Sequence, residues 1–166
     1  MGIHRLNHAV LYVRDAKKSA EFYCRVLGFR EVLNIDEHAV FLQAVDSTND
    51  HDLGLFSVGK DAADSKAGQS TVGLYRLAWE VDTLSELQRI GDLLRGAGAL
   101  TGASDHGTTK ALYARDLDGL EFEVSWLVPA DMLYLEPNGI KTMPLDLLAT
   151  MDKFGAETAG GVGVSC

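Results

Sequence analysis

The chain has 166 residues, 46% of them hydrophobic, and a formal net charge of −9. This composition supports a sizeable core and excludes extensive disorder, while the acidity argues against a nucleic-acid surface or a polybasic membrane patch. No apolar run approaches the roughly 18 residues that cross a bilayer, and the N-terminus does not resemble a signal peptide. Cys24 and Cys166 are interpreted as free thiols, so we expect a cytoplasmic protein.

The first part of the chain predicts one βαβββ module. Residues 5–13 alternate in polarity and are rich in β formers, which indicates a strand. Asp15 is a candidate N-cap for a helix that ends at Gly28. Three short strands are expected to follow, near residues 29–35, 38–45 and 52–58.

A second stretch, Gly73–Val81, repeats the pattern of Asn7–Val13 and places Arg76 where the first copy has His8. Such a repeat indicates two copies of one supersecondary unit. Thr83 and Glu86 form a candidate capping box that opens the second helix. The remaining strands are expected near residues 99–102, 109–115 and 120–126.

These patterns predict an α+β fold in which two tandem βαβββ modules form a curved mixed-sheet groove with the helices outside. We place both modules in a single domain at residues 1–128. The expected boundaries are module one at 4–58, a linker at 59–72, module two at 73–128, a C-terminal extension at 129–154 and a flexible tail at 155–166.

Strand alternation separates two charged residues from the predicted core. Successive side chains of a strand point to opposite faces of the sheet. Arg76 is therefore expected on the face opposite Leu77, and Glu123 on the face opposite Phe122 and Val124. A buried unpaired charge costs several kcal/mol, so Arg76 and Glu123 are expected to face a wet groove, a metal ion or each other. The repeat assigns His8 to the same set.

Two histidines and a carboxylate on one face are the ligand set of non-haem iron(II) oxygenases. His8 and Glu123 would supply two of these ligands, and Arg76 stands at the place of the third. Arginine has five donors and no lone pair, so it cannot replace an imidazole as ligand. A solvent-facing His8 and an ordinary Arg76–Glu123 ion pair would explain the same residues.

Four segments carry a resemblance to a known family: His8–Val13, Glu21–Phe29, Tyr75–Val81 and Asp116–Val124. Over roughly residues 4–128 the sequence resembles the vicinal oxygen chelate superfamily. That superfamily includes glyoxalase I, bleomycin and fosfomycin resistance proteins and extradiol dioxygenases. Within it, the chain is most similar to single-domain extradiol dioxygenases of the catechol 2,3-dioxygenase type.

The resemblance implies an Fe(II) or Mn(II) site with His8 and Glu123 as ligands, while Arg76 occupies the expected third ligand position. Gly54 stands where glyoxalase I would carry a glutamate ligand, which disfavours a glyoxalase-like lyase or isomerase. The implied reaction is cleavage of a catechol ring beside its diol by dioxygen, a step of aromatic catabolism.

The same resemblance implies roles for three further residues. His51 would act as acid and base, and Tyr113 and His106 would hold the substrate hydroxyls. Each of the three also has a plain explanation, as a solvated loop histidine or a packing tyrosine. We expect a homodimer that binds a small aromatic molecule and neither nucleic acid nor membrane. A metal-free binding protein of the bleomycin-resistance type is the alternative that Arg76 favours, while a rearranged metal site that recruits His51 and an inactive copy of an enzyme stay open.

Overall fold

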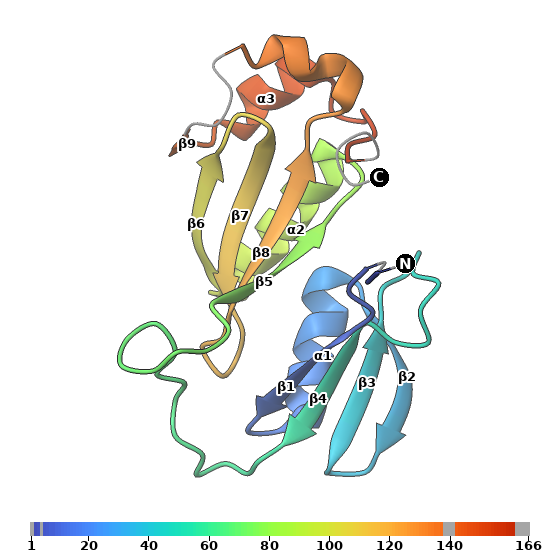
Figure 1. The fold of residues 1–166 in the computed structure, drawn as a ribbon, viewed down its shortest axis with the longest axis vertical. Coiled ribbons are helices and arrows are strands. Elements are labelled where there is room, and N and C mark those ends of the chain that lie inside the picture. Colours follow the sequence, from blue (N-terminus) through green and yellow to red (C-terminus); the bar gives the residue numbers. More distant parts are fainter. Residues whose placement is uncertain (1, 4, 138–141, 162–166) are drawn as a thin grey trace. The chain divides into compact units, whose positions relative to one another are not determined.

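The structure is a computed structural model that describes residues 2–3, 5–137 and 142–161 (Figure 1). It divides into two compact units. The first unit comprises residues 1–65 and 116–119, and the second comprises 66–115 and 120–166. Both units combine a mixed sheet with a helix, which confirms the predicted α+β class. None of the described helices is long and apolar enough to cross a membrane.

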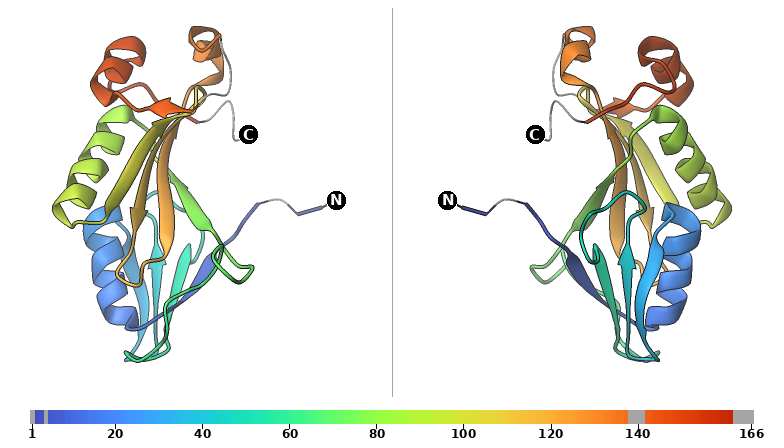
Figure 2. Two further views of the ribbon diagram at one scale, coloured as in Figure 1. Left: turned by 90° about the vertical axis from the view of Figure 1, so that its left-hand side faces the viewer. Right: turned by 90° about the vertical axis from the view of Figure 1, so that its right-hand side faces the viewer.

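The first unit contains a four-stranded sheet in the order β1-β4-β3-β2. Its elements are β1 (Ala9–Val13), α1 (Ala16–Leu27), β2 (Arg30–Ile35), β3 (Ala39–Gln43) and β4 (Leu53–Ser57). β1 runs parallel to β4, and the other neighbours are antiparallel. Helix α1 covers one face of this sheet (Figure 2). Leu11 and Val13 are buried under it, whereas Val10 and Tyr12 on the other face are exposed.

The ends of α1 follow the local rules that predicted them. The Asp15 carboxylate accepts a hydrogen bond from the Lys18 backbone N–H at 3.1 Å, which satisfies one of the free amides of the first turn. At the other end Gly28 has φ of 76°, a conformation that glycine adopts at little cost.

The second unit repeats the topology and adds an edge strand, in the order β5-β8-β7-β6-β9. Its strands and long helix are β5 (Arg76–Glu80), α2 (Leu84–Gly96), β6 (Leu100–Asp105), β7 (Thr109–Arg115), β8 (Glu121–Leu127) and β9 (Met143–Pro144). β5 pairs with β8 in parallel, as β1 does with β4. Thr83 caps α2 by accepting from the Glu86 N–H at 3.1 Å. The predicted groove formed by both sheets stays a prediction.

The C-terminal extension belongs to the second unit. It contains a 3-10 helix, η1 (Ala130–Leu135), the strand β9 and the helix α3 (Leu147–Phe154). Phe154 packs on Trp126 of β8 with ring centroids 5.4 Å apart. The described part of the expected flexible tail also contacts the second sheet, because the indole N–H of Trp126 on β8 donates a hydrogen bond to the Thr158 carbonyl at 3.1 Å. Residues 162–166 lie outside the described residues.

The turn between β7 and β8, Asp116–Gly119, is part of the first unit. The buried Tyr23 hydroxyl donates to the Asp116 carboxylate at 3.0 Å, and Arg14 Nη1 donates to Asp118 at 2.8 Å. Gly119 has φ of 79°, as the predicted Asp-Gly hairpin turn requires. These bonds tie a late segment of the chain to helix α1 and to the residue that follows β1.

We predict that Tyr23→Phe lowers the free energy of unfolding by about 1–3 kcal/mol, because the buried Asp116 carboxylate loses a donor. Burial, reinforced by the Asp116 charge, raises the pKa of Tyr23 well above its ordinary value. Stabilisation from such a group is present below the unfolded-state pKa of about 10 and is lost as the pH rises towards the folded-state pKa.

The difference in unfolding free energy between wild type and Tyr23→Phe should therefore shrink above roughly pH 10. Urea denaturation at a series of pH values measures it. The exposed Tyr134→Phe serves as control. A difference that stays constant across the alkaline range would contradict the assignment.

Candidate functional site

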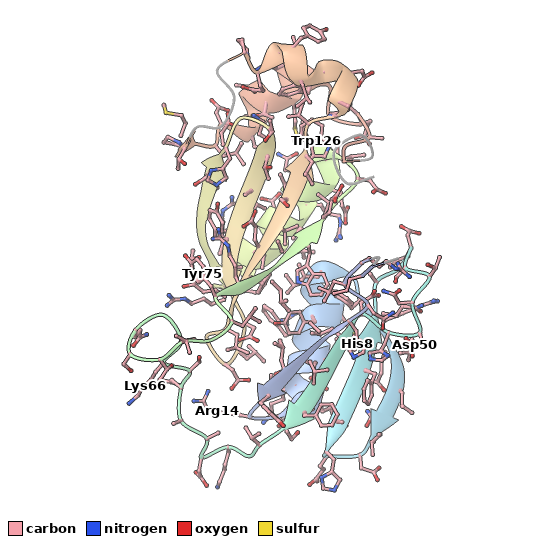
Figure 3. The ribbon with its side chains drawn as sticks, in the orientation of Figure 1. His8, Arg14, Asp50, Lys66, Tyr75 and Trp126 are labelled. Atoms are coloured by element: carbon pink, nitrogen blue, oxygen red, sulfur yellow. The ribbon has the colours of Figure 1, made fainter. Side chains whose placement is uncertain are left out.

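The first unit brings together two of the predicted site residues, His8 and His51. His8 directly precedes β1, and His51 lies just before β4. The two strands are parallel, and their register pairs Ala9 with Leu53. The parallel pairing therefore places both histidines at the same end of the sheet. Their ring centroids are 4.4 Å apart. In Figure 3, His8 lies beside Asp50, the neighbour of His51.

A network of polar side chains holds this end of the sheet. The Asn49 amide donates to the Asn7 carbonyl at 2.8 Å and to the Asp52 carboxylate at 2.6 Å. His8 Nδ1 lies 2.7 Å from the Asn7 side-chain oxygen. The segment that carries His8 is thus tied to the loop that carries His51.

His51 has a carboxylate partner and an aromatic wall. Its Nδ1 lies 3.3 Å from Asp50 Oδ2. The Phe41 ring meets the His51 ring edge-on, with the ring centroids 5.1 Å apart. The backbone N–H of His51 donates to Asp50, and this bond lowers the pKa of that carboxyl. An ionised carboxylate beside one ring nitrogen orients an imidazole and favours its acid–base use. The predicted acid–base role of His51 stays a prediction.

Gly54 on β4 offers no ligand group, and an added side chain there would begin in van der Waals contact with its neighbours. A Cβ at this position would lie 3.4 Å from the Phe41 ring and 3.5 Å from Val10 Cγ2. The site therefore has no counterpart of the glutamate that a glyoxalase-like activity requires.

The second unit brings together Arg76 and Glu123. They lie on the sheet face opposite α2, hereafter the open face, and occupy adjacent parallel strands. The register pairs Ala78 with Glu123, so Arg76 sits diagonally across from the carboxylate. Arg76 Nε is 3.1 Å from Glu123 Oε2, and the two side chains are 31% and 12% exposed. The structure thus contains the ion pair that was one interpretation of these charges.

Arg76 also lies over two aromatic rings. Its guanidinium carbon is 4.6 Å from the Tyr113 ring centroid and 4.8 Å from that of Tyr75, both within range of a cation–π interaction. Tyr113 is directly opposite Glu123 in the sheet, and its hydroxyl lies 2.5 Å from His106 Nε2. Tyr75, Arg76, His106, Tyr113 and Glu123 therefore form one connected group, the Arg76 cluster.

The Arg76 cluster does not fit the iron site that the resemblance implies. The Glu123 carboxylate faces the Arg76 guanidinium, which has no lone pair to offer a metal. His106 is hydrogen-bonded to the Tyr113 hydroxyl. The residues that the structure describes contain no group of three or more His, Cys, Asp or Glu side chains that could hold a metal ion. His8 and Glu123 belong to different units, so their joint action as ligands stays a prediction.

Sequence reasoning missed two contributors to this region. Tyr75 flanks Arg76 and has no pattern that marks it. Lys110 shares the buried face of β7 with Leu112 and Ala114 and is itself fully buried. A lysine at an apolar position of a central strand was the available signal, because lysine is almost never fully buried unless paired.

The sequence model of the Glyoxalase/Bleomycin resistance protein/Dioxygenase superfamily matches residues 5–124. The chain therefore belongs to that superfamily. Catechol-2,3-dioxygenase of Bacillus subtilis (strain 168) is 29% identical over 120 residues, which are 72% of this chain and 40% of that protein. This chain thus spans only about two fifths of the length of that relative.

Solved structures share the fold. A glyoxylase/bleomycin resistance protein/dioxygenase domain from Frankia sp. EAN1pec matches with a TM-score of 0.61 and 22% identity, covering 75% of this chain and 98% of that one. A genomically encoded fosfomycin resistance protein from Listeria monocytogenes matches with a TM-score of 0.56 and 16% identity, covering 75% and 93%. At these identities the likeness concerns the fold alone.

The ion pair at the centre of the Arg76 cluster should contribute measurably to stability. We predict that Glu123→Gln lowers the free energy of unfolding by about 1–2 kcal/mol, because it leaves a half-buried guanidinium without its charge partner. The neighbouring Glu121→Gln is the matched control. Glu121 pairs with the exposed Arg115 at 2.7 Å, and its loss should cost less than about 0.5 kcal/mol. If denaturant titrations gave the same loss of unfolding free energy for Glu123→Gln and Glu121→Gln, the stabilising role of the Arg76–Glu123 ion pair would be contradicted.

Proposed function

We propose that the chain binds a catechol-type aromatic diol on the open face of the second sheet, with the Arg76 guanidinium in the electrostatic role that the family resemblance assigns to a metal ion. The observation that carries this proposal is the Arg76 cluster. It combines a fixed positive charge, a carboxylate and a phenol–imidazole pair on one face of the sheet.

The chemistry of the Arg76 cluster suits two adjacent oxygen atoms. A guanidinium is planar and directs several N–H groups in a rigid fork, and here its Nε lies 3.1 Å from Glu123 Oε2. Diol oxygens can accept hydrogen bonds from this fork, and the Glu123 carboxylate can accept a hydrogen bond from a diol hydroxyl. The Tyr113–His106 pair offers a further hydroxyl and imidazole at the same face.

Aromatic side chains support an aromatic ligand. Tyr75 and Tyr113 present ring faces around the guanidinium, and planar rings pack well against such surfaces. The name of the Bacillus subtilis relative, catechol-2,3-dioxygenase, supports the diol class. The activity of that longer protein is not assumed for this chain.

A second candidate is an extradiol ring-cleavage dioxygenase that uses Fe(II) or Mn(II). Two observations favour it: the name of the same relative and the carboxylate-paired His51, which lies against His8. This candidate requires a third metal ligand that position 76 does not supply. The enzyme and binding candidates therefore differ in whether the wild-type chain holds a metal.

Calorimetric titration of chelator-treated protein with catechol tests the binding proposal. We expect saturable binding. Arg76→Leu should weaken it about tenfold or more, because hydrogen bonds to charged groups contribute roughly 1.5–3 kcal/mol. Tyr113→Phe should weaken binding by a smaller factor. Arg115→Leu, at an exposed ion pair of the same sheet, is the control. Absence of catechol binding, or equal affinity in Arg76→Leu, would refute the proposal.

The identity of residue 76 should also decide metal binding. We predict that Arg76→His raises the affinity for Fe(II) or Mn(II) markedly, because an imidazole supplies the missing lone pair and releases Glu123 from its cation. Anaerobic metal titration of wild type and variant measures the change, and oxygen uptake with catechol follows. Equally tight binding by both proteins would show that position 76 is not the missing ligand.

A further inference from the structure

Lys110, on the helix-covered face of β7, carries a fully buried ammonium group. Its Nζ lies 2.7 Å from Asp105 Oδ1, 2.9 Å from the Gly107 carbonyl and 2.9 Å from Glu136 Oε1. An ammonium has three N–H donors, so these partners use all of them. A buried charge is costly unless it is paired and hydrogen-bonded, which gives this arrangement a narrow range of acceptable geometries.

The partners of Lys110 stand on both sides of His106. Asp105 precedes it and Gly107 follows it, and Asp105 Oδ1 also accepts from the Gly107 N–H at 2.7 Å. The His106 N–H donates to the Thr109 carbonyl at 2.8 Å. The backbone that carries His106 is thus clamped directly by the Lys110 ammonium. A shift of that ammonium would move the imidazole relative to the Tyr113 hydroxyl, which lies 2.5 Å away.

The remaining partner, Glu136, comes from outside the repeated module. It follows η1, its side chain is 3% exposed, and it also accepts from Lys153 of α3 at 2.7 Å. The Phe154 ring lies near both ammonium groups, 5.3 Å from Lys110 Nζ and 4.8 Å from Lys153 Nζ. The C-terminal extension therefore holds the loop of His106 through one buried carboxylate.

The extension reaches His106 at a second point. The Thr142 hydroxyl lies 3.3 Å from His106 Nδ1, while Nε2 faces Tyr113. Both ring nitrogens of His106 thus have neighbours, one from the module and one from the extension. This arrangement orients the imidazole as outer hydrogen-bond partners orient functional histidines.

We propose that Lys110 and Glu136 are positioning residues: through their buried ion pair the C-terminal extension holds His106 against Tyr113 and thereby sets the affinity for the aromatic diol. The effect on affinity rests on the proposed function. The positioning of His106 does not, because it can be observed in the ligand-free protein.

Glu136→Gln tests this proposal, since it keeps the size of the side chain and leaves Lys110 its bond to Asp105. The first readout is the side-chain NMR resonances of His106 and Tyr113 without ligand, and the second is calorimetry with catechol. We expect both residues' resonances to shift and catechol affinity to fall roughly threefold or more, as loss of one well-placed hydrogen bond produces. Lys110→Met should act in the same direction and more strongly.

A control variant separates positioning from general destabilisation. Ile90→Ala trims a residue buried in α2 of the same unit, outside the Lys110 network. It should lower stability while leaving the His106 and Tyr113 resonances in place. Unchanged resonances in Glu136→Gln, or equal shifts in Ile90→Ala, would overturn the proposal. If wild type fails to bind catechol, the proposed function falls and the resonance comparison alone decides the positioning role.

Discussion

The parallel pairing of the first and fourth strands of each unit is the constraint on which the candidate site depends. In the first unit β1 lies against β4, and in the second β5 lies against β8. Parallel neighbours cannot be joined by a tight hairpin turn, because their connection must cross from one end of the sheet to the other. The pairing therefore brings His8 to His51 and Arg76 to Glu123 across long stretches of chain. The helix of each crossover then covers one face of its sheet, and in the second unit Arg76 and Glu123 lie on the other face.

On the second sheet this arrangement places the positive charge of Arg76 beside the Glu123 carboxylate. The family resemblance calls for a cation beside Glu123, and in this chain a guanidinium stands there at 3.1 Å. A metal ion would have to displace a covalently attached positive charge that is also stabilised by two tyrosine rings. Arg76 thus retains a positive charge at the carboxylate while removing the lone pair that metal coordination needs.

Local rules were sufficient to predict most of the fold. The caps at Asp15 and Thr83 and the turn at Gly119 depend on a few neighbouring residues, and strand alternation separated Arg76 from Leu77. Long-range contacts were beyond those rules. Strand β9 pairs with β6 at the edge of the sheet, and one partner of Lys110, Glu136, lies 26 residues away in the extension. No local pattern identifies such a partner.

The sequence predicted which residues belong to the candidate site, but not most of the contacts between them. Sequence alternation placed Arg76 and Glu123 on one face, and the choice between an ion pair and a metal depended on side-chain geometry across two strands. The hydrogen bond between Tyr113 and His106 likewise follows from the fold of the β6–β7 hairpin. Its support by the C-terminal extension could be recognised only in three dimensions.

The role of Arg76 is tested most directly by the metal content of the wild-type protein, purified without chelators and then reloaded anaerobically with Fe(II) and with Mn(II). We expect that neither ion is retained stoichiometrically after gel filtration, because Arg76 occupies the position of a ligand. Near-stoichiometric retention of either ion would contradict this expectation, and would show that the chain completes a metal site despite the guanidinium.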